Sequence, residues 1–350
     1  MSNHNILLIL TGGTICSFAD ERGERGADTE RAKTLIVENF EKSGSPCVGA
    51  VTFDPVSPLN ILSENMTVTH WNSLIGALKT YDFSGYDGVI ILHGTDTLAY
   101  TSALLSILLA GIKIPVFMVS SQLPIYMEEA NGNENFRCAV ELIAGGISPN
   151  VYAVYRNDET VNGERISQMY LHYASHLRQC ENHSDNFYSK DMIPLGGAAP
   201  VLQDAPVRDM LLYTCPALSS CVLCIQPYVG VDYSQYDLTG VKAVLHGTYH
   251  SCTMSVNPYG TDAASPDSIL YLKDKCDAQV PAIPLLIQPC NKDAYAYETT
   301  GMVLRNGAKA LFGTTPEMAY AKLLVGCALG LTGDALCDFS SKEINGEIIY

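Results

Sequence analysis

The sequence predicts an α/β protein with two domains, a larger N-terminal domain built on a doubly wound sheet and a smaller C-terminal α/β domain. Short apolar runs rich in valine and isoleucine alternate with helix-length segments, which is typical of parallel sheets covered by helices. The chain has 350 residues, whereas a typical domain has about 150. A stretch rich in Gly, Ala and Pro interrupts the alternation at residues 196–216, which we assign to a linker. The two predicted domains are therefore residues 1–195 and 217–350.

The N-terminal domain is predicted to alternate five buried strands with four helices. The strands are the apolar runs at residues 6–11, 49–53, 88–93, 116–120 and 150–155. The helices are predicted at residues 29–41, 69–81, 96–109 and 133–144. The second of these helices is amphipathic, with an apolar face made of Trp71, Leu74, Ile75 and Leu78. The third is apolar on most sides, so we expect it to be buried, with Asp96 as its N-cap.

The C-terminal domain repeats the alternation on a smaller scale. Its predicted strands are residues 220–226, 242–246, 284–288 and 308–313, and its predicted helices are residues 267–274 and 315–330. The last helix has a strong start signal, because Thr315 can cap it and Pro316 occupies its first helical position.

The composition excludes partners that carry many phosphates. Lys and Arg number 21 and Asp and Glu number 37, which gives a net charge of −16. Nucleic acids and anionic membranes attract basic proteins, so we expect neither as a partner. The apolar run at residues 6–10 is too short for a signal peptide, and no run approaches the length of a membrane helix. These features predict a cytoplasmic protein whose 12 cysteines are free thiols.

Two motifs that suggest metal or redox chemistry, and one histidine that could be catalytic, are more simply explained as structural residues. Cys221 and Cys224 form a C-x-x-C pair, but they lie in a predicted strand and their side chains should point to opposite faces. His246 and His250 have the spacing of a helical metal pair, yet they follow a predicted strand and enclose a glycine, so they lie in a loop. We expect His93 to be a hydrogen-bonded core histidine, and we expect no metal and no cofactor.

Two polar clusters follow predicted strands and are the candidate functional segments. One is Thr11-Gly12-Gly13-Thr14 and the other is His93-Gly94-Thr95-Asp96-Thr97. Ligands of doubly wound sheets bind at the carboxyl ends of strands, which is where both clusters fall. The glycine spacing matches neither a dinucleotide fingerprint nor a P-loop, so nucleotide binding is weakly supported. Helix capping is the alternative explanation of the second cluster.

Two threonines at two strand ends favour nucleophilic chemistry. A threonine hydroxyl becomes a good nucleophile only when a base takes its proton or a nearby charge lowers its pKa. Asp96 beside Thr95 is a candidate for that task, or for binding a substrate ammonium. Backbone N–H groups of the glycine turns are candidates for stabilising an oxyanion.

The segments that contain these two clusters resemble a known family. LTGGTI (10–15) and ILHGTDTLAYTSALLSILLAG (91–111) resemble the two signatures of the bacterial-type L-asparaginase/glutaminase family, and VSPLNILSENMTVTHW (56–71) is similar to its carboxylate-binding segment. The resemblance covers nearly the whole chain, with spacing closest to the cytoplasmic type I branch. It implies an asparaginase-like fold, a cofactor-free amidohydrolase, and sites formed between paired subunits of a homodimer or homotetramer.

The resemblance also implies roles for individual residues. Thr14 matches the threonine nucleophile, which the family carries on a mobile loop, and Thr95 with Asp96 matches the second threonine and its neighbour. Ser63 matches the serine that binds the substrate α-carboxylate, and Asp96 would bind the α-amino group. Glu64 falls where extracellular members have glutamine.

Further positions are implied at the edge of this site. Ser121 falls near the backbone that meets the scissile amide. In the family, the loop that matches Tyr249, His250 and Ser251 reaches the site of the neighbouring subunit, so these residues would line a pocket unlike the usual one.

Two departures from the family pattern concern catalysis. Gln168 falls where the family has a lysine that works with the second threonine, and glutamine cannot carry the charge. The family also has a lid tyrosine that activates the nucleophile, but no tyrosine occurs between Met1 and Lys79, and Glu24 falls near its place. Glu24 or Glu64 would then replace the missing groups, although the charged lid residues are also typical of a solvated loop.

These residues predict an amidohydrolase that acts on the side-chain amide of asparagine or of an N-substituted asparagine through a threonine nucleophile. The ligand is then a small amino-acid-like molecule. The alternative is a non-catalytic amino-acid-binding protein on the same fold.

Overall fold

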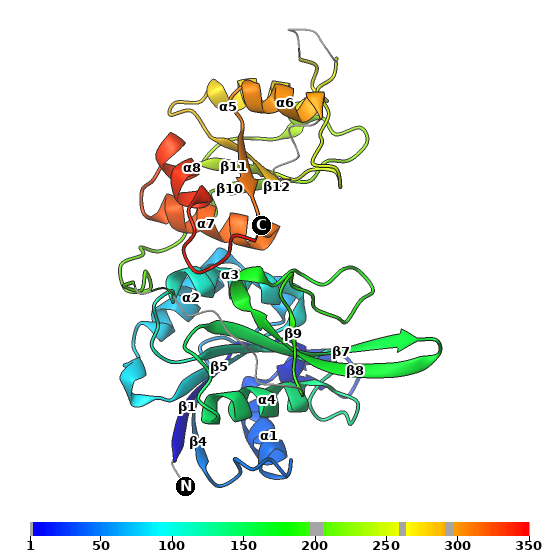
Figure 1. Cartoon of the computed structure of the whole chain (residues 1–350), viewed down its shortest axis with the longest axis vertical. Helices are drawn as coiled ribbons and strands as arrows, with labels where there is room; N and C mark the ends of the chain where they lie inside the picture. The colour runs from blue at the N-terminus through cyan, green and yellow to red at the C-terminus, as the bar shows by residue number, and fades with distance from the viewer. Residues whose placement is uncertain (1–2, 197–205, 207, 259–263, 291–296, 350) are drawn as a thin grey trace. The chain divides into compact units, whose positions relative to one another are not determined.

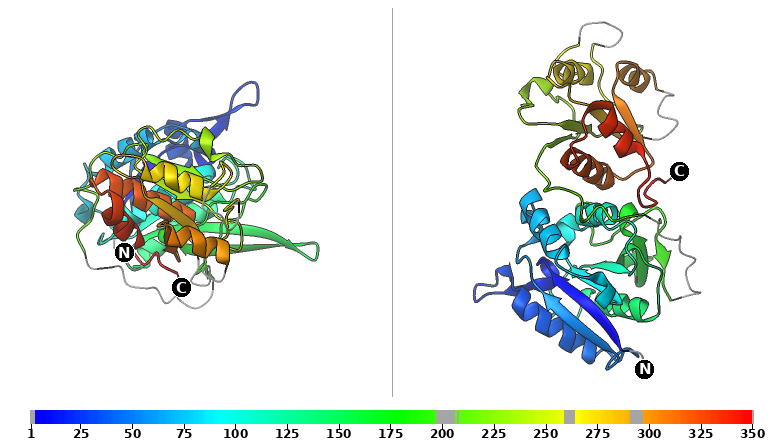
Figure 2. Two further views of the ribbon diagram at one scale, coloured as in Figure 1. Left: turned by 90° about the horizontal axis from the view of Figure 1, so that it is seen from above. Right: turned by 90° about the vertical axis from the view of Figure 1, so that its left-hand side faces the viewer.

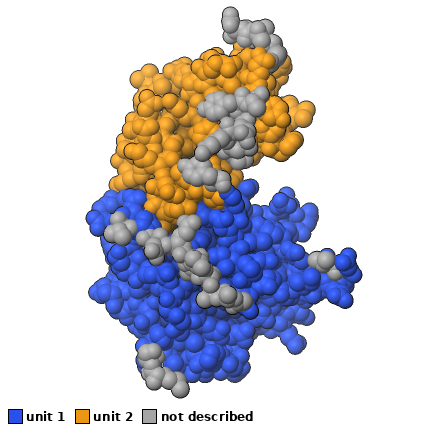
Figure 3. All heavy atoms as spheres, in the orientation of Figure 1, with its two compact units in different colours: residues 1–214 blue, residues 215–350 orange. Residues whose placement is uncertain are grey.

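The structure is a computed structural model that describes residues 3–196, 206, 208–258, 264–290 and 297–349. The chain forms two compact units, residues 1–214 and 215–350 (Figure 3). The boundary between them falls inside the predicted linker, of which residues 197–205 and 207 lie outside the described residues. Within the described ranges, no helix is long and apolar enough to cross a bilayer.

Unit 1 is built on a seven-stranded sheet with the order β4-β1-β5-β6-β7-β8-β9. The strands are β1 (His4–Leu10), β4 (Val51–Val56), β5 (Gly88–Leu92), β6 (Val116–Val119), β7 (Val151–Val161), β8 (Glu164–Tyr173) and β9 (Ile193–Pro194). Strands β4 to β7 in this order are parallel, as the alternation predicts. The sheet is nevertheless mixed, because β8 pairs antiparallel with β7 and β9 pairs antiparallel with β8, which the apolar pattern of β8 did not indicate.

Two helices cover each face of this sheet (Figure 1). Helices α1 (Thr29–Glu41) and α4 (Gly132–Ala144) pack on one face and share a hydrophobic cluster with β1, β5, β6 and β7. Helices α2 (Val68–Leu78) and α3 (Leu98–Leu108) cover the other face, joined by a hydrogen bond of 2.9 Å from Trp71 Nε1 to Thr101 Oγ1. The predicted apolar face of α2 is confirmed, since Trp71, Leu74, Ile75 and Leu78 are buried.

Two hairpins project from unit 1 (Figure 2). The short strands β2 (Ser17–Ala19) and β3 (Arg25–Ala27) form an antiparallel hairpin directly after the first polar cluster. The longer hairpin is made of β7 and β8 and turns at residues 162–163. Both hairpins start at the carboxyl edge of the parallel part of the sheet, where the candidate functional residues lie.

Unit 2 contains a parallel sheet with the order β10-β11-β12-β13. Its strands are β10 (Val222–Ile225), β11 (Ala243–His246), β12 (Leu285–Cys290) and β13 (Lys309–Phe312). Helices α5 (Ile269–Asp277) and α6 (Glu298–Arg305) share one apolar cluster with the sheet, while α7 (Pro316–Ala328) and α8 (Gly333–Ser341) lie on the other face (Figure 1). The predicted Thr315 cap of α7 is confirmed, because its Oγ1 accepts from Met318 N at 3.1 Å.

Candidate active site

The two polar clusters lie side by side at the carboxyl edge of the unit 1 sheet. They follow β1 and β5, which are adjacent parallel strands with Leu10 opposite Leu92. The loops meet at two glycines, since a Cβ at position 13 would lie 2.1 Å from the Gly94 Cα atom. Gly13 also has a φ of 77°, which favours glycine. Any side chain at position 13 would therefore push the loops that carry Thr14 and Thr95 apart.

A third segment, residues 61–65, completes this junction. Gly13 N donates to Ile61 O at 2.7 Å, and a Cβ at position 94 would lie 2.3 Å from Ser63 Oγ. Ser63 is buried and its hydroxyl donates to Asp96 Oδ2 at 2.8 Å. Ser63 and Asp96 thus form one polar pair, although they are 33 residues apart in the chain.

Asp96 does not cap a helix, so the capping prediction was wrong. Residues Thr95–Thr97 form a short 3-10 turn, and α3 begins only at Leu98 without a side-chain cap. The Asp96 carboxylate turns instead to Ser63, and the Thr97 hydroxyl donates to Ser63 O at 3.0 Å. Asp96 is exposed, which leaves its carboxylate accessible to a cationic group of a ligand.

The hydroxyls of Thr14 and Thr95 are available for chemistry. Both side chains are half-buried on the loops that meet at Gly13 and Gly94. In the described part of the chain, neither Oγ1 atom makes a hydrogen bond, whereas the backbone around them is fixed by bonds such as Ser17 Oγ to Gly13 O at 2.8 Å. The arrangement can present two hydroxyls and one carboxylate to a small polar molecule.

His93 is buried behind this site, but only one of its ring nitrogens is bonded to a described residue. Nδ1 lies 2.8 Å from Gly94 O, which makes it the N–H donor to that carbonyl. Nε2 has no partner among the described residues, and neither has the buried Ser120 hydroxyl, which follows β6. Burial lowers the pKa of His93 to about 4, so its ring is neutral at pH 7. The prediction of a hydrogen-bonded core histidine is confirmed for Nδ1, while Nε2 has no partner among the described residues.

Ser121 and Glu64 lie at opposite extremes of exposure. Ser121 is buried, and its Oγ donates to Leu123 O at 2.5 Å and accepts from Gly132 N at 3.0 Å. This hydroxyl is occupied by its own loop, so its backbone is the part left for a ligand. Glu64 is exposed in the short turn Ser63–Asn65. The substrate-binding roles of both residues stay predictions.

Gln168 lies on β8 and bonds to backbone rather than to the two threonines. Its Nε2 donates to Met169 O at 2.8 Å and to Leu195 O at 2.7 Å. Among the described residues, no hydrogen bond connects it to Thr95 or Asp96. The glutamine amide thus holds β8 to the segment that follows β9.

The predicted lid is the β2–β3 hairpin, and it contacts a tyrosine from elsewhere in the chain. Glu24 is exposed at its turn, where Asp20 Oδ1 accepts from Glu24 N at 2.9 Å. Phe18 of β2 stacks on Tyr126, with ring centroids 5.6 Å apart, and the Arg31 guanidinium lies 4.1 Å from the Phe18 centroid. The sequence gives no signal for this pairing, because 108 positions separate the two rings and only the fold brings them together.

The loop that follows β11 in unit 2 carries Tyr249, His250 and Ser251. Tyr249 and His250 are exposed, and Ser251 Oγ lies 3.0 Å from Thr253 Oγ1. A shared metal is not indicated, because His246 is buried on β11 with its Nε2 2.7 Å from Tyr233 Oη. Within the described ranges, no cluster of three His, Cys, Asp or Glu side chains is arranged for a metal. The predicted cross-subunit role of the loop stays a prediction.

Comparison with known proteins shows that the region containing both polar clusters matches one family. Residues 5–199 match the model of the N-terminal asparaginase domain. The chain is 31% identical over 166 residues to an L-asparaginase of Thermococcus kodakarensis. This alignment covers 47% of this chain and 48% of that protein. It is 31% identical over 198 residues to a glutamyl-tRNA(Gln) amidotransferase subunit of Haloquadratum walsbyi, 56% of this chain and 40% of that one. These alignments thus span less than half the length of either relative.

Solved structures share the fold along nearly the whole chain. The thermostable L-asparaginase from Thermococcus kodakarensis superposes with a TM-score of 0.75 at 21% identity, covering 99% of both chains. L-asparaginase I from Vibrio cholerae gives a TM-score of 0.73 at 21% identity, covering 100% of both. At this identity the similarity establishes the fold, and the predicted asparaginase-like fold class is confirmed.

Proposed function

The chain belongs to the asparaginase family, and from this we propose that it is an amidohydrolase that acts on the side-chain amide of asparagine or an N-substituted asparagine. The observation that carries the proposal is the junction of three loops at Gly13, Gly94 and Ser63. It brings the Thr14 hydroxyl, which bonds to no described residue, to the same sheet edge as the Ser63–Asp96 pair. An enzyme that binds the charged groups of an amino acid and attacks its side chain with a hydroxyl needs such an arrangement.

In the proposed reaction Thr14 Oγ attacks the carbon of the side-chain amide. The C–N bond breaks, and the departing nitrogen takes the hydroxyl proton and leaves as ammonia or an amine. Water then attacks the resulting ester, whose C–O bond breaks to give aspartate and the free Thr14 hydroxyl. Asp96 binds the α-ammonium and Ser63 the α-carboxylate of the substrate throughout.

Release of ammonia or amine from purified protein tests this proposal. Asparagine, glutamine and several N-substituted asparagines are incubated separately, and the nitrogen product is measured. We expect turnover of at least one asparagine derivative. A complete lack of turnover, together with tight binding of aspartate, would favour the alternative of a non-catalytic amino-acid-binding protein. The neutral Gln168 amide, bonded to two backbone carbonyls, is the observation that favours this alternative.

The small-molecule site would work without a metal or cofactor in a cytoplasmic homodimer or homotetramer. Tyr249, His250 and Ser251 would then line the site of a neighbouring subunit. The exposed loop that carries them is compatible with this role.

Asp96→Asn is expected to weaken binding of any ligand with a free α-ammonium. The exposed carboxylate would lose its charge, and a hydrogen bond to a charged group is worth about 1.5–3 kcal/mol. Calorimetry with aspartate should therefore give a Kd about 10- to 150-fold higher for the variant. Equal affinities for the two proteins would show that Asp96 serves only to hold Ser63.

Gln168→Lys is expected not to raise asparagine turnover. The new ammonium would meet two backbone carbonyls in place of the amide, and its stem would lie in a half-buried position. Burying the charge costs free energy unless a carboxylate pairs with it. Steady-state kinetics on both proteins is the measurement. A tenfold increase, about 1.4 kcal/mol of barrier, would show that a lysine alone restores ordinary asparaginase chemistry.

His93 is expected to position the Thr95–Asp96 loop through its bond to Gly94 O. An asparagine side chain can keep an N–H near the place of Nδ1, whereas leucine cannot. We therefore expect His93→Leu to lower kcat about tenfold, the value of one lost hydrogen bond, and His93→Asn to lower it less. Unfolding midpoints measured in parallel separate this effect from loss of fold. Equal kcat values for the two variants would exclude the positioning role.

A further inference from the structure

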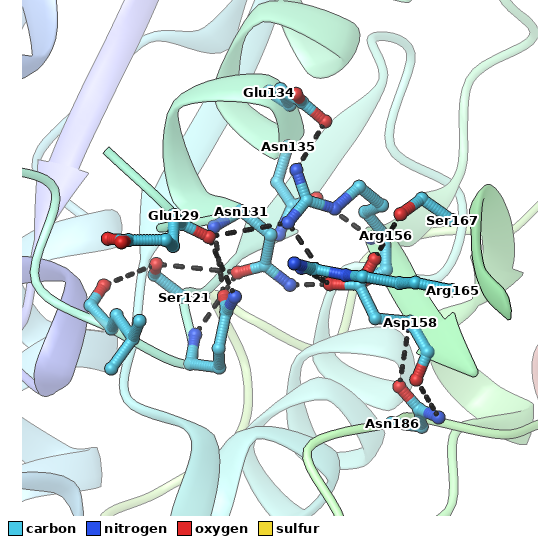
Figure 4. Close-up of polar contacts among 12 residues, drawn as sticks. Ser121, Glu129, Asn131, Glu134, Asn135, Arg156, Asp158, Arg165, Ser167 and Asn186 are labelled. Atoms are coloured by element: carbon cyan, nitrogen blue, oxygen red, sulfur yellow. Dashed lines mark hydrogen bonds and ion pairs between the residues drawn. The ribbon is translucent and has the colours of Figure 1, made fainter. Parts of the chain in front are cut away.

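A polar cavity of about 480 Å³ opens along the same sheet edge as the candidate active site. It begins at Gln122, which follows β6, the neighbour of β5. Arg156 and Asp158 of β7 and Arg165 of β8 form its far side (Figure 4). Since β5, β6, β7 and β8 are consecutive in the sheet, the cavity starts one strand away from the segment that carries Thr95.

The inner wall of the cavity is fixed by its own hydrogen bonds. Asn131 accepts from Gln122 N at 3.1 Å and donates to Arg156 O at 2.9 Å (Figure 4). Arg156 reaches Glu134 at 2.8 Å and Asp158 at 3.1 Å. Burial alone would raise the pKa of Asp158, but bonds from Arg165, Ser167 and Arg156 hold it below its ordinary value. The wall is therefore ordered before any ligand arrives.

The rim, in contrast, offers unsatisfied groups of both signs. Arg165 is 57% exposed and uses one nitrogen for its 2.8 Å bond to Asp158, which leaves other N–H groups unused within the described chain. The exposed carboxylates of Glu129 and Asp185 form no hydrogen bond to any residue that the structure describes. In the wall behind the rim, the buried Arg156 Nε has no partner among the same residues. The lining of the cavity thus offers both hydrogen-bond donors and acceptors to a ligand.

The segment of Gln179 and Cys180 contacts both this cavity and the candidate active site. Gln179 Nε2 donates to Thr95 O at 2.8 Å, and the next residue, Cys180, donates from Sγ to Asn186 O at 3.1 Å on the cavity wall. Burial raises the pKa of Cys180 to about 12, and the charges of Asp185 and Asp96 add to the rise. The segment of Gln179 and Cys180 thus contacts the loop of Thr95 at one end and the cavity wall at the other.

We propose that this cavity binds the N-substituent of the substrate amide, and that this substituent is an uncharged group that carries hydroxyls. The proposal rests on the amide hydrolysis proposed above. Ammonia, the leaving group of asparagine itself, is about the size of a water, which occupies roughly 30 Å³ of liquid. A cavity of about 480 Å³ is far larger than such a group needs.

The charges of the lining select the chemistry of the substituent. Hydroxyls both donate and accept, so a group with several hydroxyls can accept from Arg165 and donate to Asp185 or Glu129. A carboxylate on the substituent would meet the two rim carboxylates, and an apolar group would strip water from charged side chains without replacing their bonds. Hydrolysis adds one water, breaks the amide C–N bond, and releases aspartate and the hydroxylated amine.

A set of three asparagines substituted on the side-chain amide tests the proposal. Their substituents are dihydroxypropyl, propyl and carboxymethyl groups, and kcat/KM is measured for each. We expect the dihydroxypropyl compound to exceed both others at least tenfold, about 1.4 kcal/mol. Arg165→Gln should reduce this preference at least threefold. The control is Arg137→Gln, which changes a half-buried arginine on α4 paired with Glu141 and should leave the preference unchanged.

Binding measurements separate failure of this proposal from failure of the proposed reaction. Calorimetry with the same three compounds is carried out on the Thr14→Ala protein, which should bind without turnover. At least tenfold tighter binding of the dihydroxypropyl compound supports the cavity assignment, even if no amide is hydrolysed. Equal affinity or equal kcat/KM for the dihydroxypropyl and propyl compounds would overturn it, as would a preference for the carboxymethyl compound.

Discussion

Thr14→Ala is expected to reduce amide hydrolysis at least about 10³-fold, because removal of a nucleophile leaves only binding and electrostatic effects. The fold should be unaffected. Thr14 is half-buried at the start of a short 3-10 turn, and its hydroxyl bonds to no described residue, so alanine leaves no buried group without a partner. Initial rates with the best substrate and the unfolding midpoint of both proteins are the measurements.

Three further variants identify the nucleophile among the hydroxyls of the site. Thr14→Ser keeps a hydroxyl and should retain more activity than Thr14→Ala. Thr69→Ala changes an exposed threonine on α2 and should have wild-type activity. Thr95→Ala tests the second threonine, whose backbone carbonyl, and not its hydroxyl, accepts from Gln179. If Thr14→Ala kept more than a few per cent of the activity, Thr14 would not be the nucleophile.

Local sequence signals were sufficient for most of the framework of unit 1. The N-terminal strands are almost continuously apolar because both faces of a parallel sheet are buried, and α1 begins and ends where its pattern predicts. The same logic predicted that the Thr14 and Thr95 loops leave one edge. In unit 2, α6 and α8, with 8 and 9 residues, were missed, although α5 has the same length as α8 and was predicted. Length alone therefore does not explain the difference.

The site itself was only partly predictable, because its key contacts are long-range. The Gly13–Gly94 contact and the Ser63–Asp96 bond join segments far apart in the chain. The sequence around Asp96 is typical of a helix cap, but the Asp96 carboxylate accepts a hydrogen bond from the Ser63 hydroxyl and does not cap α3. The cavity walls show the same limit, since Asn131 and Asn186 reach β7 at Arg156 and Asp158 from segments 25 and 28 positions away in the chain.

Lys322→Met is expected to destabilise unit 2 by about 3–5 kcal/mol. Lys322 of α7 and Glu347 near the C-terminus are both fully buried, with Nζ and Oε1 2.5 Å apart. Burial lowers the pKa of Lys322, while the Glu347 charge opposes the change. Glu347 also accepts from Ile344 N at 2.9 Å and Asn345 N at 2.6 Å, which fixes the terminal segment. Without the ammonium, a buried carboxylate would lose its counter-charge. Urea unfolding of both proteins measures the loss.

Two matched variants separate loss of the ion pair from loss of side-chain volume. Lys342→Met changes an exposed lysine in the segment after α8, and its unfolding free energy should stay within about 0.5 kcal/mol of wild type. The double variant Lys322→Met with Glu347→Leu removes both charges, and it should recover much of the lost stability because buried ion pairs barely repay their desolvation. If the double variant were as unstable as Lys322→Met, the lysine would act through the packing of its stem or through the hydrogen bond from its Nζ to Lys342 O, and not through the ion pair. The carboxylate would then tolerate burial through its two backbone donors alone.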